Sequence, residues 1–96
     1  MKADDMSVEL YKYIGSKLKS ARKEKGILLK DIAVKLNRSR HYVIDAESGR
    51  FRMTIDKLYE YCAILDIRLK DLLPDFIPGS STESFNKIRE QYRGLN

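Results

Sequence analysis

One short stretch of the chain, residues 38–48, carries polar side chains at a helical spacing that suits hydrogen bonding to nucleic-acid bases. A helix beginning near Ser39 presents four residues on its outward face: Arg40, His41, Ile44 and Asp45. A guanidinium bonds in bidentate fashion to guanine, an imidazole donates to or accepts from a base edge, an isoleucine contacts a thymine methyl group, and a carboxylate accepts from a cytosine amine. Asp45 is alternatively placed to orient Arg40. The predicted chemistry is direct readout of base pairs.

The positive charge of the chain is concentrated around this stretch. The whole chain has a net charge of +5, whereas residues 12–52 contain twelve Lys or Arg against four acidic residues, a net of +8. Residues 1–11 and residues 53–75 each come to −2. Concentrated basic charge favours a polyanionic partner such as DNA, although a solvated basic helix face has the same composition.

The apolar spacing is helical nearly throughout and predicts an all-α chain. Five helices are expected, from about Ser7 to Lys25, Lys30 to Leu36, Ser39 to Ser48, Thr54 to Leu65, and Leu69 to Leu73. The predicted N-caps are Ser7, Ser39 and Thr54. Gly26 and Gly49 are expected to end the first and third helices in a left-handed conformation, and Asn37 to form the tight turn before the third. Two helices joined by such a turn place the third helix on an exposed edge.

The chain is expected to form one compact domain with a short tail. Residues 1–7 are predicted to be a flexible N-terminus, residues 8–73 the domain, residues 74–81 a linker with both prolines, and residues 82–96 a short amphipathic helix. The apolar residues of this last helix, which are expected to contact a second copy of the chain or a partner protein, are Phe85, Ile88 and Tyr92.

The stretch from Gly26 to Leu73 resembles the XRE family, the Cro/phage-repressor-like helix-turn-helix proteins. The likeness rests on residues at family spacing: Gly26, Ile32-Ala33, Asn37, Ser39, Val43, Glu47-x-Gly49, Ala63-x-Leu65 and Leu69-x-x-Leu72-Leu73. Residues 14–26 are similar to the first helix of the family, so the resemblance covers about sixty of the 96 residues. It implies a compact five-helix domain of the lambda-repressor-like type and a function in sequence-specific binding of double-stranded DNA.

The resemblance also implies roles for individual residues. Arg22 and Glu47 are expected to form a structural ion pair between the first and third helices. The residues that are expected to contact DNA phosphates are Lys30, Arg38, Tyr42, Ser48, Arg50 and Arg52. Such contacts set the register and the salt dependence of binding, but they carry no sequence information.

The start of the second helix departs from the family pattern. Most relatives have Ser or Thr followed by Gln at this point, whereas this chain has Leu28 and Leu29. The missing polar N-cap is expected to cost the helix about 1 kcal/mol. Either the docking on DNA differs from that of relatives, or the two leucines face a partner or a remodelled core.

Catalysis and metal binding have little support in the sequence. His41 and Cys62 are the single residues of their types, and they give neither a nucleophile–base pair nor a set of metal ligands. Cys62 lies on an apolar helical stripe and is expected to be an inert core residue. We therefore expect no enzymatic activity, no metal, no cofactor and no small-molecule ligand.

The chain is expected to be cytoplasmic. Its apolar runs fall well short of the ~20 residues that a membrane-spanning helix needs. The N-terminal residues 1–7 lack the apolar stretch of a secretory signal. A single cysteine is also typical of a reducing compartment.

The predicted function is that of a transcriptional repressor which binds a pseudo-palindromic operator as a homodimer. Its half-sites are expected about 10 base pairs apart, with one recognition helix in each. One alternative is an antitoxin-like or other protein-interaction module whose tail binds a partner protein. Another is a controller protein of a restriction–modification system, which has the same fold and the same role on DNA.

Overall fold

The computed structural model describes residues 3–75 and 89–91. Over residues 3–75 the chain forms four α-helices and one 3-10 helix: α1 (Ala3–Glu24), α2 (Leu29–Leu36), α3 (Arg40–Ser48), α4 (Ile55–Leu65) and η1 (Leu69–Asp71). The described ranges contain no strand, so the all-α fold class is confirmed. The predicted contact residues Phe85, Ile88 and Tyr92 lie outside the described residues. No helix of the described part is both long and apolar enough to cross a lipid bilayer.

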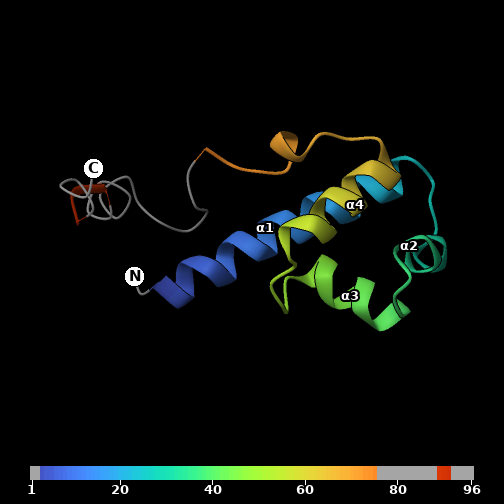
Figure 1. Ribbon diagram of the computed structural model, residues 1–96, viewed down its shortest axis with the longest axis horizontal. Coiled ribbons are helices and arrows are strands. Elements are labelled where there is room, and N and C mark those ends of the chain that lie inside the picture. Colours follow the sequence, from blue (N-terminus) through green and yellow to red (C-terminus); the bar gives the residue numbers. More distant parts are fainter. Residues whose placement is uncertain (1–2, 76–88, 92–96) are drawn as a thin grey trace.

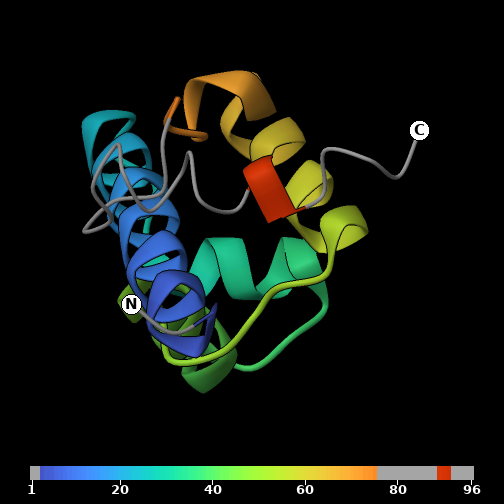
Figure 2. The ribbon, with the colours of Figure 1, turned by 90° about the vertical axis from the view of Figure 1, so that its left-hand side faces the viewer.

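The shorter helices pack along one long helix. In Figure 1, α1 extends along the molecule with α4 beside it, while α2 and α3 lie below. Figure 2, turned by 90°, shows α1 and α4 on opposite sides and α3 at the lower end. α3 contacts α1 and α2, and α4 contacts the same two helices. α3 is therefore supported from behind by two helices and lies at an edge of the domain.

The core lies where the four α-helices meet. The residues that are less than 2 % exposed come from all four of them: Leu18, Ile32, Leu36, Val43, Tyr61 and Leu65. The predicted inward residues of the third helix, Val43 and Ala46, are both buried. Cys62 is buried in the same cluster, and its burial raises the pKa of the thiol, as expected for an unreactive core cysteine.

The predicted turn between α2 and α3 is confirmed in detail. Asn37 has φ 56° and ψ 47°, the left-handed conformation that asparagine tolerates better than most residues. The hydroxyl oxygen of Ser39 then accepts a hydrogen bond of 3.1 Å from the backbone N–H of Tyr42 and caps α3. Gly49 ends α3 with φ 77°, as predicted. These local signals fix both ends of α3.

One predicted N-cap is wrong, and a second occupies its predicted position without making the capping hydrogen bond. α1 begins at Ala3 rather than at Ser7, because residues 3–14 contain no glycine or proline that would stop the helix, so Ser7 lies inside it. Thr54 occupies the N-cap position of α4, but its hydroxyl makes no capping hydrogen bond. That hydroxyl bonds instead to the Asp56 carboxylate and holds the pKa of this carboxyl below its usual range. The predicted fifth helix is present as the short η1.

Candidate nucleic-acid interface

The close approach of α1 and α3 depends on two glycines. A Cβ added to Gly15 would lie 2.5 Å from the carbonyl oxygens of Ala46 and Glu47. A Cβ added to Gly49 would lie 2.6 Å from the Cα of Lys12. The end of α3 thus rests on the backbone of α1, with no room for a side chain between them. The sequence showed Gly15 only as a lone glycine within a helical pattern, which often has a packing reason but does not show which segment packs there.

Arg22 and Glu47 join the same two helices through a buried ion pair. The Arg22 Nε–H donates to Glu47 Oε2 at 2.8 Å, and a second N–H donates to Oε1 at 3.1 Å. Arg22 also donates to the carbonyl oxygen of Ile27 at 3.0 Å. Both charged residues are buried, at 7 % and 6 % exposure. The pKa of Arg22 is raised, chiefly by its hydrogen bond to Glu47, so the guanidinium stays charged.

Tyr61 of α4 is a third member of this buried polar cluster, and the sequence gave no sign of it beyond an apolar helical position. Its hydroxyl donates a hydrogen bond to Glu47 Oε2. Tyr61 is fully buried. Burial, together with this hydrogen bond, raises the pKa of the phenol far above its ordinary value. Three helices are therefore joined at one carboxylate, directly behind the outward face of α3.

The outward face of α3 carries the predicted base-reading residues at its exposed edge. Arg40 and His41 are exposed in the first turn, and Asp45 is partly exposed one turn later. Ile44 is 43 % exposed although it is a large apolar residue. An apolar side chain surrounded by hydrogen-bonding groups suits a base-pair edge, which offers a thymine methyl beside donors and acceptors.

The structure pairs Asp45 with Arg50, a contact that the sequence did not predict. An Arg50 guanidinium nitrogen lies 3.2 Å from Asp45 Oδ1, with the side chains 72 % and 30 % exposed. The sequence had suggested Arg40 as the residue that Asp45 orients. Arg50 follows the left-handed Gly49, which turns the chain back beside the last turn of α3. Asp45 is thus placed to position Arg50 at the edge of the recognition surface.

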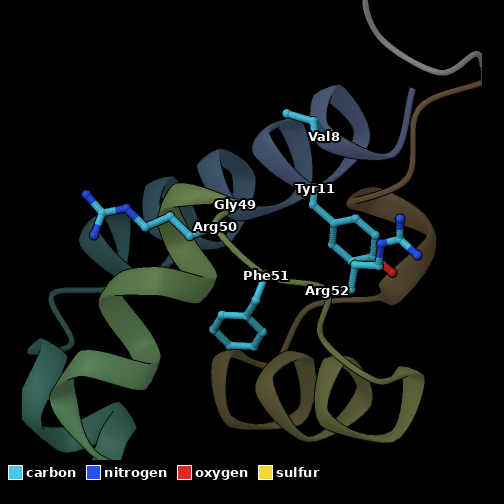
Figure 3. A pocket seen from close by; sticks show the side chains of 6 residues that line it. All are labelled: Val8, Tyr11, Gly49, Arg50, Phe51 and Arg52. Carbon is cyan, nitrogen blue, oxygen red and sulfur yellow. The ribbon is translucent and has the colours of Figure 1, made fainter. Parts of the chain in front are cut away.

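Arg50 and Arg52 do not form one basic patch. Figure 3 shows the two side chains extending to opposite sides of the loop after α3. Arg50 extends over α3, whereas Arg52 lies on the side of Tyr11. A shallow pocket of about 90 Å³ lies between them, lined also by Val8, Gly49 and Phe51. This volume is well below the ~300 Å³ of a typical small-molecule site.

The remaining predicted phosphate contacts flank α3. The Arg38 guanidinium lies 5.5 Å from the centre of the Tyr42 ring, a cation–π distance. The Tyr42 ring in turn lies 4.9 Å from the Phe51 ring, which links the turn before α3 to the loop after it. Ser48 donates to the carbonyl oxygen of Asp45 at 3.0 Å. Lys30 is exposed in the first turn of α2.

The two leucines at the start of α2 have different environments. Leu28 occupies the N-cap position with extended backbone and no capping hydrogen bond, and it is 56 % exposed. Leu29 is half-buried and packs against the core. Leu29 is therefore explained by its packing against the core. Leu28 has no such role, and it leaves the start of α2 without a polar cap.

Two other kinds of site can be considered among the described residues: a metal centre and a ligand pocket. Within the described ranges, no group of three or more His, Cys, Asp or Glu side chains is arranged to hold a metal ion. A second cavity, of about 220 Å³, lies between α1 and the segment around η1. It too is smaller than a typical ligand pocket. The exposed edge of α3 is the surface on which charge and hydrogen-bonding groups converge.

Comparison with family models and with curated proteins gives no match. Solved structures with the same fold are found. The clp gene regulator ClgR from C. glutamicum is 28 % identical over 66 % of this chain and 82 % of its own, with a TM-score of 0.63. The restriction–modification controller protein C.AhdI from Aeromonas hydrophila is 26 % identical over 67 % of this chain and 96 % of its own, with a TM-score of 0.60. SinR, solved in complex with the protein SinI, is 26 % identical over 86 % of this chain and 82 % of that chain, with a TM-score of 0.59.

Proposed function

We propose that the chain is an XRE-like helix-turn-helix protein with a lambda-repressor-like fold, and that it is a transcriptional repressor which binds a pseudo-palindromic operator as a homodimer. Two of the similar proteins are described as a gene regulator and a controller protein, and neither description is that of an enzyme. Repression requires only that the operator be occupied, which a compact DNA-binding domain achieves by itself. We assign this activity to the cytoplasm.

The observation that carries the proposal is the exposed edge of α3. Arg40, His41 and Ile44 face outward there, while the opposite face of the helix is buried in the core. The first turn of such a helix enters the major groove and reaches base edges. Arg40 is the best placed of the three for a bidentate contact to guanine, because it lies at the start of the helix.

Phosphate contacts hold this helix in register in our proposal. Arg38 precedes α3 and Arg50 follows it, so the two guanidiniums bracket the reading face. Tyr42, Lys30, Ser48 and Arg52 complete the proposed phosphate contacts. Each neutralised phosphate releases counterions, so affinity should fall steeply as salt concentration rises.

The test is selection of bound duplexes from a random-sequence library at near-physiological salt. We expect a two-fold symmetric motif with half-site centres about 10 base pairs apart, one helical turn of DNA. Recovery of no motif, with weak binding abolished by moderate salt, would show that the fold serves a different function. A single unpaired half-site would retain DNA recognition but reject the homodimer.

A second candidate function is favoured by one comparison. SinR, which matches over 86 % of this chain, was solved in complex with a different protein, SinI. We therefore keep the proposal that Phe85, Ile88 and Tyr92 bind a partner protein. The double variant Phe85→Asp/Ile88→Asp tests it: unchanged mass and unchanged DNA motif are expected if these residues serve a partner. Dissociation of the homodimer would assign them to the dimer instead.

A further inference from the structure

Helix α4 carries an apolar stripe that the domain itself does not cover. Ile55 is 61 % exposed and Tyr59 is 60 % exposed. Ala63 is exposed as well. These residues recur every fourth position, so they lie on one face of the helix. Leu58, Tyr61, Cys62 and Leu65 form the buried face next to it. α4 is thus apolar on its outer side as well as on its inner side.

The charge beside this stripe is small and slightly negative. Within Ile55–Leu65 the charged residues are Asp56, Lys57 and Glu60, a net of −1. Lys57 Nζ lies 2.8 Å from Glu60 Oε2, so the flank of the stripe is partly neutralised within the helix. The chain as a whole has a net charge of +5. α4 is therefore a surface where two copies of a basic chain can meet with little repulsion.

We infer that a second copy of this chain docks on the α4 stripe, with the two α4 helices antiparallel and Tyr59 at the two-fold axis. The inference rests on the proposed function, because it gives the homodimer of that proposal a specific interface. A chain of 96 residues buries a limited share of its own surface, which makes association through an exposed apolar face favourable.

The order of side chains along the stripe is self-complementary. When an antiparallel copy is centred on Tyr59, Ile55 of each copy lies opposite Ala63 of the other. A large residue then meets a small one on both sides of the axis, which lets the helices approach closely. The same contact surface is used by both copies, as a two-fold interface requires.

The position of α4 is compatible with DNA binding by both copies. Figure 2 shows α4 on the side away from α1, with α3 at the lower end of the domain. A two-fold axis can run beside α4 and point toward the end of the domain where α3 lies. Such an axis leaves α3 of each copy exposed on the same side of the dimer. This is the arrangement that two half-sites on one face of a duplex require.

A cysteine placed at the axis provides the sharpest test. In Tyr59→Cys the two new thiols lie opposite each other, so mild oxidation with oxidised glutathione should link most of the chain into a covalent dimer. The matched control is Val34→Cys, on α2, where the side chain is 78 % exposed. It should remain largely uncrosslinked. The native Cys62 is buried and does not interfere. Equal crosslinking of the two variants would overturn the inference.

The mass of the full-length chain in solution gives an independent readout. Wild type should sediment as a dimer, and Tyr59→Asp should raise the dimer dissociation constant roughly tenfold or more, because interface tyrosines are often dominant contributors. Val34→Asp should leave the mass unchanged. A monomeric wild type, or a Tyr59→Asp variant that stays dimeric, would overturn the inference.

The DNA readout separates this inference from the proposed function. A symmetric DNA motif together with an unaffected Tyr59→Asp dimer would reject the α4 interface but retain the repressor. A dimer that dissociates in Tyr59→Asp, together with no selected motif, would retain the interface and reject the DNA function.

Discussion

The guanidinium of Arg22 on α1 donates two hydrogen bonds, of 2.8 and 3.1 Å, to the carboxylate of Glu47 on α3. The two residues are 25 positions apart in the sequence. Glu47 lies in the last turn of α3, and Tyr61 donates to its carboxylate from a third helix. The pair lies behind the face that we propose reads DNA, and it fixes where α3 lies.

Removing the cation of this pair should strongly destabilise the domain. Arg22→Met leaves the Glu47 carboxylate buried without its counter-charge, and we expect the free energy of unfolding to fall by about 3–5 kcal/mol. Arg22→Lys keeps the charge but not the bidentate geometry, so its loss should be smaller. Urea denaturation followed by circular dichroism measures both. A loss below about 1 kcal/mol for Arg22→Met would show that the pair is not a structural one.

The buried phenol of Tyr61 should make stability fall at alkaline pH. Its pKa is raised in the folded chain, chiefly by burial, so the folded state keeps the proton above pH ~10, where an unfolded tyrosine loses it. The contribution of the protonated Tyr61 phenol to stability is therefore complete at neutral pH. As pH rises above ~10 this contribution is lost, and the free energy of unfolding falls by up to about 1.4 kcal/mol per pH unit.

The matched comparison for this pH dependence is Tyr61→Phe. The variant should be somewhat less stable at neutral pH, because the hydrogen bond to Glu47 is gone. Between about pH 9 and 11 its free energy of unfolding should fall less steeply than that of wild type. Equal slopes for the two proteins would contradict the assignment of a raised pKa to this residue.

A methyl group at Gly15 should push α1 and α3 apart. The added Cβ would lie 2.5 Å from two carbonyl oxygens of α3, which are backbone atoms and cannot rotate away. We expect Gly15→Ala to cost about 1–3 kcal/mol by overpacking, more than the ~1 kcal/mol that alanine gains over glycine in a helix. Thermal unfolding compares it with Ser16→Ala, an exposed neighbour on α1. A Gly15→Ala protein as stable as Ser16→Ala would show that the two helices are not in such close contact.

Arg50 should contribute affinity without sequence preference, with Asp45 as its positioning residue. Arg50→Ala is expected to weaken binding to all duplexes about equally and to reduce the salt slope by about 1. If Asp45 acts by holding Arg50, Asp45→Ala should have a smaller effect when Arg50 is already alanine. A double-mutant cycle should give a coupling of about 0.2–1 kcal/mol, as for exposed ion pairs. Full additivity would mean that Asp45 acts independently, for example on a cytosine amine.

Arg52→Ala tests the second proposed phosphate contact separately, because the Arg52 side chain extends to the other side of the loop.

The features of the fold that the sequence predicts correctly are those set by local backbone preference. Asn37, Ser39 and Gly49 were identified because a positive φ or a helix cap restricts which residue types fit. The same local rules failed for α1, since a serine preceded by helix-compatible residues is also accommodated inside a helix. They did not anticipate Asp66, which ends α4 with φ 55° although aspartate is an uncommon choice there.

The features that the sequence does not predict are contacts between distant segments. Gly15 against α3, Tyr61 against Glu47, and Arg50 against Asp45 each depend on how the helices and the loop after α3 are placed in space. A periodicity argument places Tyr61 in the core, but it cannot show what the hydroxyl bonds to. The outward face of α3 was predictable because a helix with a buried side fixes which residues lie opposite.

The most direct measurement of the central claim, that α3 reads bases through Arg40, is duplex selection with Arg40→Ala beside wild type, with Lys17→Ala on α1 as a surface-charge control. Our account predicts that Arg40→Ala loses roughly 1–3 kcal/mol of affinity for the selected site and that its motif loses preference at one base pair in each half-site. Lys17→Ala should keep the wild-type motif. An Arg40→Ala protein with unchanged affinity and an unchanged motif would show that α3 is not the reading helix.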